Sequence, residues 1–275
     1  MKKIFLFIWL GLFLLTGCAT APVQHHVTLP GSQGNLSTVL YTPSGKKTYP
    51  LVIILHGFNA SKEMYLLSDL SKQLNEQAIA TLLFDFNGHG ASGGSFLDMT
   101  VFNELEDARR VYAYAAQLPG VSSISLVGHS QGGVVAAILA GELGVDKIKS
   151  LVLMAPAPEL KEDTAKGNLF GVTYNSKNPP EYITLSNGLK VGRAYLESTP
   201  YIPIYEMAPF YTGSVMVLHS QDDELVPYKY GQQMSQLYKN ARLQTLQGFD
   251  HCFTQDTPAA NKIVTRFFTQ QLQSK

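Results

Sequence analysis

The chain has 275 residues, of which 45% are hydrophobic and 15% are charged, so it can form a large core and is too apolar for a disordered protein. Its 21 Lys and Arg residues balance its 21 Asp and Glu residues, which excludes the basic excess that neutralises nucleic-acid phosphates or anionic membrane surfaces. We therefore expect no nucleic-acid partner. Two cysteines and scattered histidines do not make a disulfide scaffold or a zinc site, and we expect no metal and no cofactor.

The first residues have the pattern of an export signal. Lys2 and Lys3 precede an apolar run at 4–15, which is too short to cross a bilayer but suits the hydrophobic part of a signal peptide. The sequence Leu-Thr-Gly-Cys at 15–18 resembles the bacterial lipobox. The resemblance implies a signal peptide at 1–17, lipidation of Cys18, and a mature protein anchored in the cell envelope outside the cytoplasm, at the outer membrane or periplasm of a Gram-negative host. The alternative is an ordinary signal peptide that contains a cysteine.

Residues 18–34 are polar and rich in turn-forming residues, and we interpret them as a tether and entry loop before a domain at 35–275. Short apolar runs in that domain predict strands at 36–41, 51–55, 78–84, 124–127, 151–154, 215–218 and 242–246. Helical spacing of apolar residues predicts helices at 65–74, 101–117, 132–143, 232–237 and 259–272. Strands that alternate with helices predict an α/β fold, with a mostly parallel sheet covered by helices on both faces.

One segment interrupts this alternation. The residues between 155 and 214 contain many prolines and tyrosines and show no clear period. Structureless loops of this length are rare in compact domains. We therefore expect an inserted lid subdomain at about 156–213, over one end of the sheet.

The strongest local signal is Gly-His-Ser-Gln-Gly at 128–132, which matches the nucleophile elbow G-x-S-x-G between a predicted strand and a predicted helix. A serine on this tight turn has a strained backbone, and the glycines around it leave room for that conformation. The turn raises the Ser130 hydroxyl above the sheet edge, beside the free N–H groups of a helix N-terminus. We predict Ser130 as a nucleophile; the alternative is a glycine-rich turn with an ordinary serine.

A serine hydroxyl needs a base and an orienting acid to react, and in this architecture the chain order is serine, acid, histidine. Only His219 and His251 follow Ser130. His251 lies in a turn after a predicted strand and is our predicted base, whereas we expect a structural role for His219. The spacing D-x-x-V-P selects Asp223 as the acid, with its neighbour Asp222 as the alternative.

The oxyanion that forms during acyl transfer needs hydrogen-bond donors at fixed positions. One donor is the backbone N–H of the residue after the nucleophile, Gln131, and the second comes from the loop after the strand at 51–55. In that loop we select Phe58. We therefore expect the N–H groups of Phe58 and Gln131 to form the oxyanion hole.

From about residue 36 to 272 the chain resembles the α/β-hydrolases, and more narrowly it is similar to bacterial cinnamoyl and feruloyl esterases. The segments that carry this similarity are HGF at 56–58, FDFNGHGASGG at 84–94, MTVFNELEDA at 99–108, VGHSQGGVVA at 127–136, APAPELKEDT at 155–164, GVTYN at 171–175, PIYE at 203–206 and GFDHCF at 248–253. The resemblance implies the triad Ser130, Asp223 and His251 and the same pair of oxyanion donors.

The resemblance also implies that the inserted segment forms one wall of an acyl pocket, where polar side chains hold the phenolic hydroxyl of a hydroxycinnamate. Asp163 and Tyr195 lie at the matching positions. The sequence departs from the family between 176 and 200, and Phe170 stands where relatives can carry a polar residue. Cys252 lies in the similar DHCF segment, and we expect it to have a buried packing role.

These observations predict a serine esterase that hydrolyses carboxylic esters, above all hydroxycinnamate esters, through an acyl-enzyme intermediate. Its partners would be small-molecule esters, and its N-terminal lipid would be its only contact with a membrane. The alternatives are a general short-chain carboxylesterase, an aminopeptidase-like serine hydrolase, and a non-catalytic surface binding lipoprotein that keeps the fold.

Overall fold

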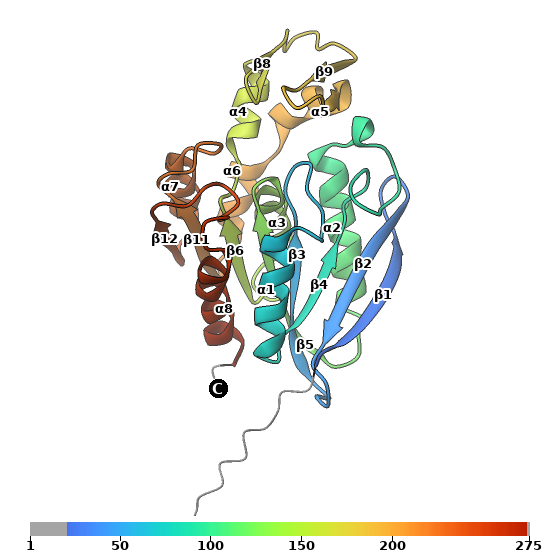
Figure 1. The fold of residues 1–275 in the computed structure, drawn as a ribbon, viewed down its shortest axis with the longest axis vertical. Helices are drawn as coiled ribbons and strands as arrows, with labels where there is room; N and C mark the ends of the chain where they lie inside the picture. Colours follow the sequence, from blue (N-terminus) through green and yellow to red (C-terminus); the bar gives the residue numbers. More distant parts are fainter. Residues whose placement is uncertain (1–20, 274–275) are drawn as a thin grey trace, which may run out of the picture.

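The computed structural model describes residues 21–273, so the predicted signal peptide and Cys18 lie outside the described residues. An eight-stranded sheet forms the centre of the molecule, in the order β1-β2-β4-β3-β5-β6-β11-β12 (Figure 1). The six strands from β4 to β12 in this order run parallel to one another, and β2 runs antiparallel to both of its neighbours, β4 and the edge strand β1. The strands are β1 (Val23–Pro30), β2 (Asn35–Thr42), β3 (Tyr49–Leu55), β4 (Ala80–Phe84), β5 (Val121–His129), β6 (Ser150–Met154), β11 (Ser214–Ser220) and β12 (Ala241–Leu246). The predicted α/β fold with a mostly parallel sheet is confirmed.

Strand β1 corrects the predicted tether at 18–34. Residues 23–30 pair with β2 over their whole length, from Val23 opposite Thr42 to Pro30 opposite Asn35. Most side chains of β1 are exposed and only Leu29 is buried. The prediction failed because an edge strand that buries so little carries no apolar run by which to find it.

Two layers of helices cover the sheet. Alternate residues of β3 point to opposite faces, as strand geometry requires, so Ile53 and Ile54 belong to different core clusters. One face packs against α1 (Tyr65–Glu76) and α8 (Thr257–Gln273), which lie side by side (Figure 1). The other face packs against α2 (Val101–Ala115), α3 (Gln131–Leu143) and α7 (Tyr228–Gln236). Within residues 21–273, no helix combines the length and hydrophobicity needed to cross a membrane.

Helix α3 is the central helix of its layer. Its first ten residues are all buried, because it contacts the sheet, α2 and the inserted segment at once. A helix that is apolar on every side has this environment. The N-terminus of α3 is therefore held rigidly at the carboxyl end of β5, where Ser130 lies.

The segment between β6 and β11 folds into short elements. They are α4 (Glu159–Ala165), β7 (Asn168–Leu169), β8 (Val172–Thr173), β9 (Tyr182–Thr184), β10 (Lys190–Gly192), α5 (Arg193–Ser198) and α6 (Ile204–Met207). Figure 1 shows α4, β8, β9 and α5 beyond one end of the sheet. Phe170 and Leu189 of this segment line the same cavity as Ser130, so the segment covers the end of the sheet at which the elbow lies. Its action as a lid stays a prediction.

Candidate active site

Ser130 lies at the turn between β5 and α3 in a backbone conformation that few side chains adopt, with φ 55° and ψ −124°. The predicted strand, turn and helix around it are confirmed. A Cβ at Gly128 would lie 2.1 Å from the carbonyl oxygen of Gly132, and a Cβ at Gly132 would lie 2.2 Å from that of His56. Both elbow positions therefore require glycine, because backbone from neighbouring segments occupies the space of a side chain.

Asp223 and His251 come together from the loops that follow β11 and β12. His251 Nδ1 donates a hydrogen bond of 2.8 Å to Asp223 Oδ2, and both side chains are buried. Asp223 Oδ1 accepts from the backbone N–H groups of Leu225 and Val226, each at 2.9 Å. The carboxylate is thus held by its own loop and orients the imidazole. Among the described residues His251 Nε2 has no hydrogen-bond partner, which leaves it free to accept a proton.

His219 contacts the same carboxylate. Its side chain is fully buried, and Nε2 donates to Asp223 Oδ2 at 3.1 Å and to the carbonyl oxygen of Val226 at 3.0 Å. Burial opposes ionisation of Asp223, but the hydrogen bonds from His219 and His251 outweigh it and hold the pKa of this carboxyl well below its usual range. Asp223 is therefore charged at neutral pH and can stabilise an imidazolium at His251. The position of His219 fits the structural role predicted for it.

His129 supports the loop that carries His251. Its Nε2 donates to the backbone carbonyl of His251 at 2.9 Å, and the two rings lie 4.9 Å apart. Burial, and then the neighbouring His251, lower the pKa of His129 to about 3. The ring is therefore neutral at physiological pH and acts as a fixed donor. Sequence reasoning missed this role, because nothing in the elbow motif requires a histidine before the serine.

Ser130 and His251 line one cavity of about 630 Å³ at the end of the sheet. Phe58, Phe96 and Phe170 line it as well. Their rings form an aromatic wall, with the Phe58 ring centroid 5.3 Å from that of Phe96 and 5.1 Å from that of Phe170. We call this space the catalytic cavity. A planar aromatic group would fit against such a wall through stacked and edge contacts.

The two expected oxyanion donors lie beside Ser130. Gln131 is the first residue of α3, and the first N–H groups of a helix have no partner within the helix. The loop that carries Phe58 approaches the nucleophile closely, because a Cβ at Gly57 would lie 2.9 Å from the Cβ of Ser130. The structure therefore brings Phe58, Ser130 and Gln131 to one place.

Asp163 and Tyr195 are not among the described residues that line the catalytic cavity. Asp163 lines a neighbouring cavity of about 340 Å³, which shares Phe170 and Leu225 with the catalytic cavity. Tyr195 is fully buried, and its hydroxyl donates to the side-chain oxygen of Gln131 at 2.7 Å. The predicted contact of Asp163 with a substrate stays a prediction, whereas Tyr195 presents no exposed surface to either cavity.

Two further residues lie at the site: Cys252, whose position differs from the expected one, and Glu104, for which no role was predicted. Cys252 is half-buried on the wall of the catalytic cavity, which corrects the buried packing role we expected. Glu104 is buried in α2 and accepts a hydrogen bond of 2.8 Å from the Gln131 side chain. The signal for Glu104 was present in the sequence, since it lies one turn after Val101 on the apolar face of a predicted helix.

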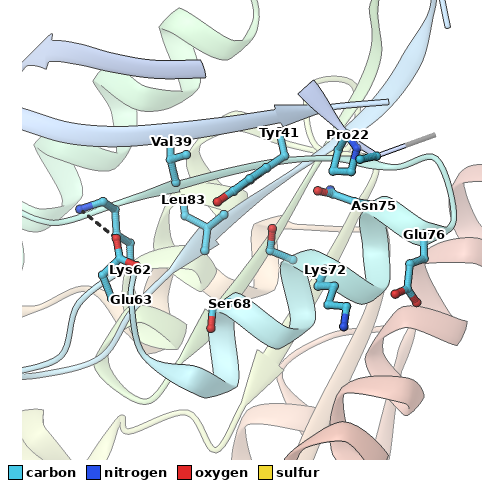
Figure 2. A pocket seen from close by; sticks show the side chains of 12 residues that line it. Pro22, Val39, Tyr41, Lys62, Glu63, Ser68, Lys72, Asn75, Glu76 and Leu83 are labelled. Carbon is cyan, nitrogen blue, oxygen red and sulfur yellow. Dashed lines mark ion pairs between the residues drawn. The ribbon is translucent and has the colours of Figure 1, made fainter. Parts of the chain in front are cut away.

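Another cavity, of about 380 Å³, lies between α1 and the strands β2 and β4 (Figure 2). Val39 and Leu83 line its apolar side, and Ser68, Lys72 and Glu76 of α1 also border it. None of the catalytic candidates lines it. Over the part of the chain that the structure describes, no three acidic, histidine or cysteine side chains are grouped to hold a metal ion.

Comparisons with known proteins agree with this architecture. A family model described as "Serine aminopeptidase, S33" matches residues 46–180, and one described as "TAP-like protein" matches residues 200–273. The structure is similar to Est1E from Butyrivibrio proteoclasticus, solved with ferulic acid bound, with a TM-score of 0.87 and 31% identity over 90% of this chain and 100% of that one.

Curated relatives are more distant. Protein ABHD12B of Homo sapiens is 26% identical over 70% of this chain, and the lysophosphatidylserine lipase ABHD12 of Gallus gallus is 24% identical over 80% of it. The chain spans 51% and 58% of the lengths of these two proteins. The strand order, the elbow and the similarity to Est1E over 90% of the chain agree on one family. The chain belongs to the α/β-hydrolase superfamily.

Proposed function

We propose that the protein is a serine hydrolase that cleaves carboxylic esters through an acyl-enzyme intermediate. The observation that carries this proposal is the hydrogen bond of 2.8 Å between His251 and the buried carboxylate of Asp223, on the wall of the cavity that also holds the elbow serine. A nucleophile, a base and an orienting acid in this relation suit acyl transfer.

The proposed reaction has two halves. His251 Nε2 takes the proton of the Ser130 hydroxyl as its oxygen attacks the ester carbonyl carbon, and the N–H groups of Phe58 and Gln131 donate to the oxyanion. The ester C–O bond then breaks, and the alcohol leaves with the proton from His251. Water attacks the acyl-enzyme with His251 again as base, which releases the acid and restores the serine hydroxyl.

We propose hydroxycinnamate esters as the preferred substrates. The aromatic wall of Phe58, Phe96 and Phe170 supports an aromatic acyl group, and so does the similarity to Est1E, whose structure holds ferulic acid. An acyl group that passes between Phe170 and Leu225 would enter the neighbouring cavity, where Asp163 can accept a hydrogen bond from a phenolic hydroxyl. Replacing Asp163 with Asn should therefore weaken turnover of ferulate esters more than that of butyrate esters.

Turnover by the wild type and the Ser130→Ala variant tests the reaction. With methyl ferulate and p-nitrophenyl butyrate as substrates, we expect the variant to lose at least about 10³-fold in kcat, because the covalent route is closed. The melting temperature serves as the control for folding. A variant as active as the wild type would overturn the assignment of the nucleophile.

A wider substrate panel separates the alternatives. Methyl ferulate, methyl cinnamate, a short aliphatic ester and an aminoacyl amide should be cleaved in that order of preference. Faster amide cleavage would favour an aminopeptidase-like enzyme, and equal turnover of all esters a general carboxylesterase. A fluorophosphonate probe should label the wild type at Ser130; absence of both labelling and turnover would favour a binding protein.

We also propose that the chain is exported and lipidated at Cys18, which would anchor it in the cell envelope. The basic start, the apolar run at 4–15 and the lipobox-like sequence at 15–18 support this proposal. Metabolic labelling with radioactive palmitate should mark the wild type and not Cys18→Ser. An unlabelled wild type would overturn lipidation.

A further inference from the structure

The side chain of Gln131 lies between two residues from different parts of the fold. Its Nε2 group donates to Glu104 Oε2 of α2 at 2.8 Å, and its Oε1 accepts from the Tyr195 hydroxyl of α5 at 2.7 Å. All three side chains are almost completely inaccessible, at 0% exposure for Gln131 and Tyr195 and 1% for Glu104. The donor and acceptor ends of one amide are thus both fixed in a dry environment, where such bonds are strong.

Tyr195 also contacts the second expected oxyanion residue. Its ring packs edge-on against Phe58, with centroids 5.7 Å apart and planes at 66°. One side chain from the inserted segment therefore touches both residues whose backbone N–H groups would hold the oxyanion. The hydroxyl of Tyr195 acts on Gln131 and the ring acts on Phe58.

We propose that Glu104 and Tyr195 are positioning residues that hold the oxyanion hole through Gln131 and Phe58, and that Tyr195 does not contact the substrate. This inference rests on the serine hydrolysis proposed above. The Tyr195 hydroxyl proton is directed at Gln131, and its side chain has no exposed surface from which to reach a ligand. A backbone N–H donor that moves by a fraction of an ångström stabilises the transition state less. The contacts that fix the two donors should therefore affect kcat.

The protonation of Glu104 is consistent with this role. Burial raises the pKa of Glu104 to about 8, against a smaller opposing effect of its hydrogen bond with Gln131. The carboxyl group is therefore mainly neutral at pH 7 and adds little negative charge beside the developing oxyanion. A glutamine at position 104 would keep an oxygen acceptor for the Gln131 Nε2 group and remain neutral, whereas a leucine would remove that oxygen acceptor.

The first test compares Tyr195→Phe with Tyr211→Phe. Tyr211 is also a buried tyrosine, but its hydroxyl donates to the carbonyl of Ile148 at 3.0 Å and not to Gln131. We expect Tyr195→Phe to lower kcat about tenfold to a hundredfold by the same factor for methyl ferulate and methyl cinnamate, with KM little changed. Tyr211→Phe should keep the wild-type kcat and KM.

The second test uses Glu104→Gln and Glu104→Leu, which differ in their ability to accept from Gln131. The glutamine variant should keep kcat near the wild-type value at pH 7, and the leucine variant should have a lower kcat. Melting temperatures verify that both variants are folded at the temperature of the assay. This pair decides the question even if Tyr195→Phe folds poorly. Equal kcat values for the two variants would overturn the role of Glu104.

Other outcomes identify which claim fails. A Tyr195→Phe defect confined to methyl ferulate, or one seen in KM alone, would show that Tyr195 binds the substrate. Either result would overturn the proposed positioning role. An unchanged kcat in an active enzyme would do the same. An inactive wild type, with no labelling at Ser130, would instead overturn the proposed hydrolysis itself.

Discussion

His251 and Asp223 are joined by a hydrogen bond of 2.8 Å between Nδ1 and Oδ2, across two loops at the same end of the sheet. Because the carboxylate accepts, the proton of a neutral His251 must lie on Nδ1, and Nε2 is left as the basic nitrogen. The bond therefore sets both the direction of the ring and the atom that can act as a base.

Replacing Asp223 with Asn should lower kcat by about 10⁴-fold, because an amide can donate to Nδ1 and favour the wrong tautomer of His251. Hydrolysis of p-nitrophenyl butyrate measures the effect. Asp222→Asn is the matched control, since the Asp222 side chain is exposed and accepts a hydrogen bond of 2.6 Å from the Gly248 N–H. A larger loss at Asp222 than at Asp223 would make Asp222 the acid.

Replacing Gly132 with Ala should destabilise the fold by about 3 kcal/mol and abolish turnover, because its Cβ would lie 2.2 Å from the His56 carbonyl oxygen. Gly133→Ala is the control in the same helical turn. Its Cβ would lie 3.2 Å from both the Gly128 carbonyl oxygen and Pro156 Cβ, a much milder overlap, so a smaller loss of stability than for Gly132→Ala is expected. Denaturant unfolding of both variants is the measurement. Similar stabilities would contradict the close approach at the elbow.

Asp85 ties together two loops that border the catalytic cavity. Its carboxylate accepts from Lys62 Nζ at 2.6 Å, from the Lys62 N–H at 2.7 Å and from the Ala91 N–H at 2.8 Å, and it is fully buried. Asp85→Ala should cost about 3–5 kcal/mol, since it leaves the buried Lys62 ammonium group with only the exposed Glu63 carboxylate, 3.7 Å away.

The control for Asp85 is Glu197→Ala, which removes a pair with Arg193 at 3.6 Å in which both side chains are about half exposed. Such surface pairs contribute less than about 1 kcal/mol. The unfolding free energies of the two variants should therefore differ severalfold. Comparable losses would show that the buried pair contributes no more than a surface pair.

Glu104 should make stability depend on pH. Burial raises its pKa from 4.5 to about 8, so between these values the folded state holds a proton that the unfolded state has released. The free energy of unfolding therefore falls as pH rises through this window, by on the order of a few kcal/mol. Glu104→Gln removes this loss, so its stability relative to the wild type should increase between pH 5 and pH 8. Urea unfolding at both pH values measures it, and a constant difference would exclude a buried acid.

Most of the sheet could be predicted because its central strands are covered on both faces. The run at 51–55 is apolar throughout, and it forms the buried part of β3. Strand β1 was not predicted, for the opposite reason: its edge position leaves most of its side chains exposed to water. The buried face of α2 includes the charged residues Glu104 and Asp107 as well as its apolar residues, and the spacing of apolar residues does not predict that burial.

The sequence by itself determined the elbow at 128–132, the chain order of the proposed catalytic residues and the α/β class, because these depend on local glycine requirements and on apolar period. Only the tertiary structure decided that His219 shares the carboxylate of Asp223 and that Tyr195 turns its hydroxyl to Gln131, 64 positions away. Such contacts depend on how an irregular segment packs over the sheet, and no local pattern in the chain encodes which buried donor meets which acceptor.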